Sequence, residues 1–140
     1  MQLVADANVL LSAVIGGRAA LAPRHDKVEQ VFTPAAAYDE VFEYLLPLAK
    51  KKRLDLDTLL LACAALPVTV VERSEYQTKL STAKRRIGKR DPDDVDVLAL
   101  ALMLQLPVWS HRQRLRAHWC RVVHHRRTPE DARNRIRVKR

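Results

Sequence analysis

The chain has 140 residues, 48% of them apolar, which fits one compact domain. Two cysteines are too few for a disulfide framework, and no apolar stretch reaches the roughly 18 residues needed to span a bilayer. Nothing at the N-terminus resembles a signal peptide, so we expect a cytoplasmic protein with no membrane association.

The formal net charge of +9 resides in the C-terminal segment. Residues 1–110 hold 14 basic and 14 acidic side chains, whereas residues 111–140 hold 11 basic side chains against Glu130 and Asp131. A concentrated basic segment attracts polyanions through counterion release, so nucleic acid is the first partner to consider. A solvated tail is the alternative for residues 128–140. We therefore divide the chain into a domain over residues 1–127 and a basic tail over residues 128–140.

Short apolar runs alternate with helix-length segments, which is the pattern of βα units. In chain order, the first part is predicted to hold a strand at residues 3–5, a helix at 9–20, a strand at 31–33 and a helix at 35–49. Gly16 and Gly17 weaken the first helix, and Pro34 ends the second strand. We expect Pro47 to interrupt the second helix and residues 50–53 to form a solvated connection.

The same alternation continues to the end of the apolar pattern. The second part is predicted to hold a helix ending at residue 65, a strand at 68–71, helices at 74–87 and 92–105, a strand at 108–110 and a candidate fifth strand at 121–124. Asp55 or Asp57 can cap the first of these helices, and Gly88 ends the second. Asp91 is expected to cap the helix that Pro92 opens. The elements together predict an α/β fold with a mainly parallel, roughly five-stranded sheet.

Three acidic residues lie where a predicted strand ends or a predicted helix begins: Asp6, Glu40 and Asp94. Ligands of parallel α/β sheets gather outside the carboxyl ends of the strands, where loops and helix N-termini converge. A fold of this type can bring the three carboxylates to one cation. Oxygen ligands suit Mg²⁺ or Mn²⁺, and the lack of a Cys/His cluster argues against zinc.

Each carboxylate alone also has a structural explanation. Asp91, Asp93 and Asp94 suit a helix start because of capping and the helix dipole, and Asp94 can close a capping box with Asp91. Glu40 alone could be a solvated residue on a helix surface. Asp6 is harder to explain in this way, since a charge placed directly after a buried strand is costly without a partner.

Taken in order, these segments resemble the PIN domain over roughly residues 1–112. The resemblance rests on Asp6-Ala7-Asn8-Val9-Leu10-Leu11-Ser12-Ala13, on Glu40, and on Asp91-Pro92-Asp93-Asp94 followed by an apolar helix and Leu106-Pro107-Val108-Trp109-Ser110. It implies a three-layer α/β/α sandwich and a Mg²⁺- or Mn²⁺-dependent ribonuclease, commonly the toxin half of a bacterial toxin–antitoxin pair of the VapC type.

The resemblance also assigns roles to single residues. Asp6, Glu40 and Asp94 match the metal-binding and catalytic acids of the family. Asn8 matches a polar residue that helps orient the site, and Ser110 matches the small hydroxyl residue after the fourth strand. Asp91 and Asp93 are further candidates for supporting the site.

The chain departs from the family at Arg112, where an acid often follows the hydroxyl residue by two positions. A positive charge there would weaken the binding of a second cation, or would hold a phosphate as a bidentate donor. Asp91, Asp93 or Asp96 could supply another ligand instead. An alternative function therefore stays open, a degenerate PIN fold that binds RNA or a partner protein without nuclease activity.

Three partners follow from the charge pattern and from the resemblance. Arg112, Arg114 and Arg116 begin a basic stretch that can receive the RNA backbone. An antitoxin protein could insert a basic residue among the carboxylates, and the apolar helices permit a homodimer. A phosphatase of the haloacid dehalogenase type also places an aspartate after its first strand, but Asp6-Ala7-Asn8 lacks the second acid of that motif.

Overall fold

A computed structural model describes residues 1–16 and 28–110. Its sheet consists of β1 (Gln2–Ala5), β2 (Gln30–Pro34), β3 (Thr69–Val71) and β4 (Val108–Trp109). All pairs are parallel and the order is β3-β2-β1-β4, with Val4 opposite both Phe32 and Val108. The predicted α/β fold with a parallel sheet is confirmed. The candidate fifth strand at residues 121–124 and the tail at 128–140 lie outside the described residues.

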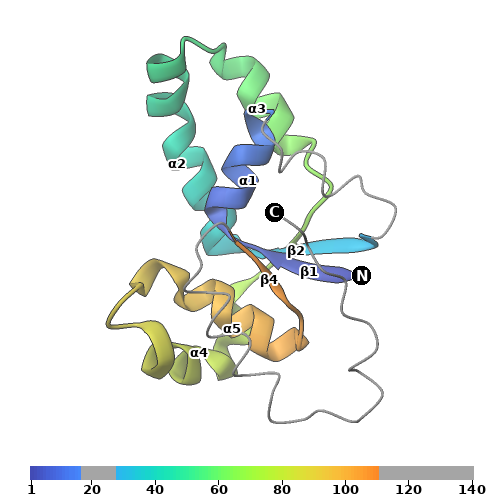
Figure 1. Cartoon of the computed structure of the whole chain (residues 1–140), viewed down its shortest axis with the longest axis vertical. Helices are drawn as coiled ribbons and strands as arrows, with labels where there is room; N and C mark the ends of the chain where they lie inside the picture. Colours follow the sequence, from blue (N-terminus) through green and yellow to red (C-terminus); the bar gives the residue numbers. More distant parts are fainter. Residues whose placement is uncertain (17–27, 111–140) are drawn as a thin grey trace, which may run out of the picture.

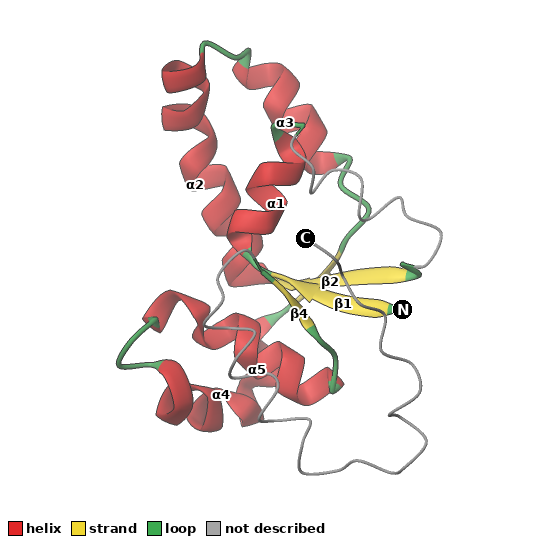
Figure 2. Cartoon of the chain, viewed as in Figure 1, coloured by secondary structure: helices red, strands yellow, loops and turns green. Residues whose placement is uncertain are grey.

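Helices cover both faces of this sheet, as Figures 1 and 2 show. One layer holds α1 (Ala7–Val14), α2 (Ala35–Lys52) and α3 (Leu56–Ala64), which contact one another. The other holds α4 (Arg73–Ile87) packed on α5 (Val95–Leu104). The three-layer α/β/α arrangement is therefore present. Among these helices, none is long and apolar enough to cross a membrane.

The direction in which strands are added reverses beside β1. The chain proceeds from β1 to β2 to β3 on one side, and then returns to place β4 on the other side of β1. Such a reversal creates a crevice at the carboxyl ends of the two strands that flank it, because their connections leave toward opposite faces. Asp6 and Ser110, the residues that directly follow β1 and β4, lie at this edge.

The core lies on both sides of β1 and centres on α5. Val4 and Ala5 of β1 are fully buried, as are Leu98, Ala99 and Leu100 of α5. Helix α5 contacts β1, β2 and β4 as well as α4, so apolar residues are needed on nearly all its sides. This packing fixes the start of α5, and with it Asp94, close to the carboxyl edge of the sheet.

Helix α2 is longer than predicted and continues through Pro47 to Lys52. The predicted interruption at Pro47 was wrong, and so was the assignment of residues 50–53 to a connection. Val41, Leu45 and Ala49 are buried at intervals of four residues, so one packing face runs past the proline on both sides. Burial of this face outweighs the one hydrogen bond that proline cannot donate. Arg53, at a φ of 53°, ends the helix.

Several other helix ends differ from the prediction by a few residues. Helix α1 starts at Ala7 and ends at Val14, because the C-cap and the positive φ of Gly16 (79°) turn the chain away. Asp55, and not Asp57, caps α3 by accepting from the Thr58 amide at 3.1 Å. Helix α4 begins at Arg73, one residue before the predicted start.

The segment between α4 and α5 departs from the predicted capping scheme. Pro92 opens a short 3-10 turn, η2 (Pro92–Asp94), and α5 begins only at Val95. Asp91 occupies the cap position, but its side chain makes no capping hydrogen bond, and neither does that of Asp94. The predicted cap and the capping box were therefore wrong. The backbone closes the turn instead, through a 3.1 Å bond from the Asp94 amide to the Asp91 carbonyl.

Candidate functional site

Asp6 is buried at the carboxyl end of β1, with 2% of its surface exposed. Its Oδ1 accepts a hydrogen bond from the Val9 amide at 2.8 Å, which makes it the N-cap of α1. Its Oδ2 accepts a hydrogen bond from the Ser110 hydroxyl. Two donors, together with the positive end of the α1 dipole, stabilise a carboxylate that would otherwise be costly to bury.

Ser110 reaches Asp6 because β4 lies next to β1 in the sheet. Ala5 is opposite Trp109, and the Asp6 amide donates to the Trp109 carbonyl at 3.4 Å. Ser110 is fully buried. The structure therefore brings together two predicted site residues that are 104 positions apart in the sequence.

Buried polar side chains concentrate at this edge of the sheet. Among the described residues, the buried polar or charged ones are Asp6, Thr33, Asp94 and Ser110. Three of these are predicted site residues, and Thr33 is the one that was not predicted. The Thr33 hydroxyl donates to the Ala5 carbonyl at 3.1 Å and so ties the end of β2 to the end of β1, next to Asp6. A polar β-branched residue directly before Pro34 was the available signal.

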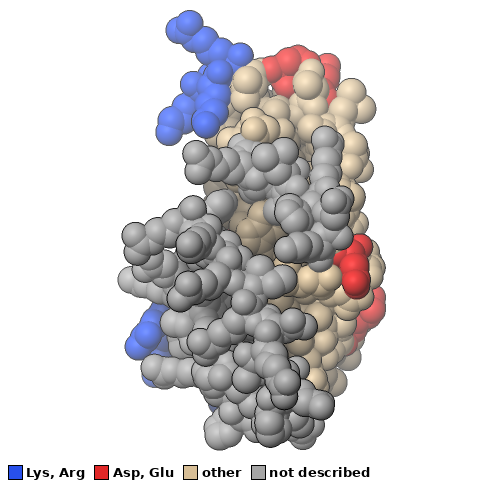
Figure 3. All heavy atoms as spheres, turned by 45° about the vertical axis from the view of Figure 1, so that its right-hand side comes forward, with Lys and Arg blue, Asp and Glu red and all other residues tan. Residues whose placement is uncertain are grey.

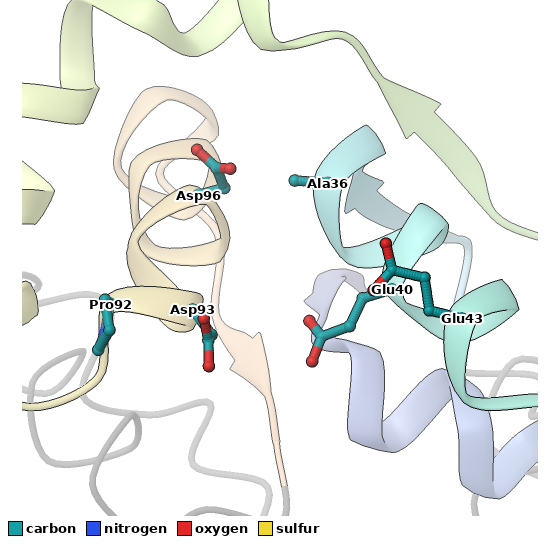
Figure 4. A pocket seen from close by; sticks show the side chains of 6 residues that line it. All are labelled: Ala36, Glu40, Glu43, Pro92, Asp93 and Asp96. Atoms are coloured by element: carbon teal, nitrogen blue, oxygen red, sulfur yellow. The ribbon is translucent and has the colours of Figure 1, made fainter. Parts of the chain in front are cut away.

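Glu40 lies in an acidic pocket of about 270 Å³ between α2 and the start of α5. Figure 4 shows Glu40 extending from α2 toward Asp93 of η2. The pocket is lined by Ala36, Glu40, Glu43, Pro92, Asp93 and Asp96. Glu43 and Asp96 were not among the predicted site residues, although Asp96 was considered as a substitute ligand.

The predicted triad is thus divided between two adjoining places. Asp6 and Asp94 are buried, and neither lines the pocket that contains Glu40. No three acidic, histidine or cysteine side chains of residues 1–16 and 28–110 are grouped closely enough to enclose a metal ion. The side chains at the pocket are nevertheless of the right kind, since carboxylate oxygens are the ligands that Mg²⁺ and Mn²⁺ take in proteins.

Asp96 is held at the wall of the pocket by the neighbouring helix. Its Oδ1 lies 3.5 Å from Arg73 Nε at the start of α4, close enough for an ion pair but without hydrogen-bond geometry. The buried Tyr76 hydroxyl, which has no hydrogen-bond partner within the described segments, lies nearby. Burial, and then the negative charge of Asp96, raise the pKa of Tyr76 to about 12. Tyr76 is therefore neutral at physiological pH, and its hydroxyl can donate or accept a hydrogen bond.

The remaining predicted residues have mixed positions. Asn8 is exposed in the first turn of α1, and Asp91 is half-buried before η2. Asp93 is exposed and lines the acidic pocket. The predicted RNA-binding residues, Arg112, Arg114 and Arg116, lie outside the described residues.

A doubly wound parallel sheet with buried carboxylates at its switch point belongs to the class of α/β proteins that bind ligands at the carboxyl edge. Comparison with known families specifies the class further. The sequence model of the PIN domain family matches residues 4–132, so this chain belongs to the PIN domain family. Members of this family generally have nuclease activity and generally use divalent metal ions. No curated protein matches the chain.

Proposed function

We propose that this chain is a Mg²⁺- or Mn²⁺-dependent endoribonuclease that hydrolyses RNA phosphodiester bonds. Family membership supports nuclease chemistry in general. Two observations carry the proposal: the buried carboxylate of Asp6 at the carboxyl end of β1, and an acidic pocket that contains Glu40 and Asp93, next to buried Asp94 in the chain. Carboxylates gathered in this way repel one another, and a bound divalent cation would relieve that repulsion.

Some of these side chains would hold a divalent ion, and others orient the carboxylate of Asp6. Glu40 and Asp93, which face each other across the pocket, carry the carboxylate oxygens that would contribute to holding a divalent ion. A bound ion of this kind polarises a phosphoryl oxygen and lowers the pKa of a coordinated water. Asp6 is oriented by Ser110 and Val9, and its negative charge at the edge of the site favours cation binding.

Asp6→Asn is the sharpest test of this function. Asparagine caps a helix about as well as aspartate, so α1 keeps its cap while the charge is lost. We expect cleavage of a single-stranded RNA in Mn²⁺ to fall at least about a hundredfold, since loss of a negative charge that favours cation binding removes several kcal/mol of transition-state stabilisation. The matched control is Asp55→Asn, which changes an exposed aspartate with the same capping role at the start of α3.

Equal activity in the two variants and the wild type would refute the proposed role of Asp6. The alternative is a PIN fold that binds RNA or protein without cutting, and Arg112 in place of the usual acid favours it. RNA binding without cleavage in either Mg²⁺ or Mn²⁺, and without measurable affinity for either ion, would establish that alternative.

The biological setting is also part of the proposal. We place the protein in the cytoplasm as the toxin of a type II toxin–antitoxin pair, with an antitoxin that covers the acidic pocket through a basic side chain. The acidic lining supports this choice, because a cationic group entering it would compete directly with a divalent ion. A homodimer is compatible with the exposed apolar residues of α2, which include Phe42 and Leu46.

A further inference from the structure

Most basic side chains of the described segments belong to two clusters. The first, which we call the tip lysines, consists of Lys50, Lys51 and Lys52 in the last turn of α2. The second, which we call the basic turn, ends α4 and continues beyond it; it consists of Lys84, Arg85, Arg86, Lys89 and Arg90. All of these side chains are exposed, and Figure 3 shows basic groups apart from each other at the end of α2 and lower down, at the level of α4.

The helix dipole explains the position of only some of the cations in the basic turn. Cations in the last turn of a helix are favoured by its dipole, which accounts equally well for the tip lysines and for Lys84, Arg85 and Arg86. Lys89 and Arg90 lie after the end of α4, where this effect has ended. Within the described residues no carboxylate forms an ion pair with any of the five. Five like charges within seven residues repel one another and favour a polyanion.

The basic turn is held in one conformation by the backbone. The amides of Arg90 and Asp91 both donate to the carbonyl of buried Ile87, each at 2.9 Å. Gly88 permits this close fold, since a Cβ there would lie 2.5 Å from the Lys84 carbonyl oxygen. The charges are therefore presented by a fixed turn, which lowers the entropy that a partner must remove on binding.

The C-terminal end of the basic turn, at Arg90, lies close to the acidic pocket along the chain. Pro92 and Asp93 line the pocket, and Arg90 precedes Pro92 by two residues, so their Cα atoms are at most about 7 Å apart. The tip lysines are on the opposite end of α2 from the pocket. Glu40 and Lys51 are separated along the helix axis by about 16 Å, at 1.5 Å per residue.

We propose that the basic turn is a docking site for the phosphate backbone of single-stranded RNA, placed so that the strand continues into the acidic pocket. This inference rests on the proposed function and extends it, because it assigns the substrate a path across the surface. Cations beside the pocket hold the phosphates that flank the reacting one, and the carboxylates of the pocket repel the strand unless divalent ions are bound. Docking at the basic turn therefore needs no divalent ion, whereas cleavage does.

The test compares two triple variants of the full chain that lose the same charge. One is Lys84→Ala/Lys89→Ala/Arg90→Ala in the basic turn, and the other is Lys50→Ala/Lys51→Ala/Lys52→Ala at the tip. The probe is a fluorescein-labelled, 20-nucleotide single-stranded RNA, followed by anisotropy in EDTA between 50 and 200 mM salt. Circular dichroism checks that both variants are folded.

We expect the basic-turn variant to bind about tenfold more weakly or worse at 0.1 M salt, and its slope of log K against log salt to fall by about 2. The tip variant should keep the wild-type slope. Equal losses in both variants would overturn the proposal, because they would reflect net charge alone. Loss of binding to phosphatidylserine vesicles, with RNA binding unchanged, would overturn it in favour of a membrane surface.

The outcome is independent of whether the chain cuts RNA. A basic-turn variant that binds normally in EDTA, in a chain that cleaves in Mn²⁺, would refute the docking site and leave the nuclease intact. If the wild type never cleaves RNA, and only the basic-turn substitutions weaken its RNA binding, the nuclease proposal is refuted and the docking site is retained.

Discussion

Ser110 and Asp6 show how one side chain can serve both the fold and the site. The hydrogen bond between them joins the ends of β1 and β4 and occupies the Asp6 oxygen that the α1 cap leaves free. Buried acceptors that carry a charge are the ones whose loss of a donor costs most. Ser110 is therefore expected to matter for stability even where no substrate is present.

Ser110→Ala should lower the free energy of unfolding by about 1.5–3 kcal/mol, the usual cost of losing a hydrogen bond to a charged group. Thr33→Val is the matched comparison, since it removes a buried hydroxyl of similar position that donates to a neutral carbonyl, and about 1 kcal/mol is expected. Urea denaturation measures both. A Ser110→Ala cost equal to or below that of Thr33→Val would contradict a stronger hydrogen bond at Asp6 than at the Ala5 carbonyl.

At this scale the sequence was informative about Asp6 and uninformative about Asp96. A charge directly after a buried strand needs a partner, so the position of Asp6 alone marked it as unusual. Glu43 and Asp96 carry no such signal, because each is an ordinary acid on a helix until α2 and α5 are placed side by side. Their membership of the pocket depends on tertiary packing that periodicity does not encode.

Pro47 is the feature of the helices that the sequence predicted least well. It lies inside α2 without breaking it, since Val41, Leu45 and Ala49 continue the buried face on both sides. A proline at such a position cannot donate to the carbonyl four residues earlier and strains the preceding turn. The helix therefore carries a local cost that packing offsets.

Pro47→Ala should raise the free energy of unfolding by about 2 kcal/mol, because it restores one hydrogen bond while making the unfolded chain slightly more flexible. Pro92→Ala is the comparison, as Pro92 opens η2, where no donor is needed, and no stabilisation is expected there. Thermal unfolding of the two variants separates the cases. Stabilisation by both substitutions would mean that the effect is not specific to a helix interior.

The predicted helix boundaries differ from the observed ones for reasons that are specific to each helix. Asp91 was a good candidate cap by residue type, but the 3-10 turn satisfies the amide of Asp94 with the backbone carbonyl of Asp91. The sequence did not distinguish Asp57 from Asp55 as the N-cap of α3, because both precede the same apolar run. Residue preferences of this kind name the few possible ends of a helix, and packing selects among them.

For the whole molecule, the alternation of strands and helices predicted a parallel sheet with helices on both faces, and the structure has both. The order β3-β2-β1-β4 was beyond the reach of that pattern, since nothing in the composition of residues 108–110 states that they pair with β1. That order is known only from the structure. Placement of the carboxylates at a shared edge depends on it.

Divalent ions should stabilise the folded protein, because they bind an arrangement of acids that the unfolded chain lacks. At Mn²⁺ concentrations about a hundredfold above the dissociation constant, roughly 2.7 kcal/mol is expected, enough to raise the melting temperature by several degrees. Scanning calorimetry with and without Mn²⁺ measures this. The rise should shrink in Asp6→Asn and persist in Asp55→Asn; an unchanged wild-type melting temperature would count against the site.

The pairing of β1 with β4 has a consequence during protein synthesis. Asp6 is made among the first residues, but its partner Ser110 follows 104 positions later, after all the other described strands. Two strands so far apart in the sequence pair late, because the entropy lost on closing the long loop between them must be offset by contacts formed earlier. A nascent chain therefore lacks the assembled carboxyl edge until β4 has left the ribosome, and a ribosome still translating this protein is not exposed to a completed site on its own nascent chain.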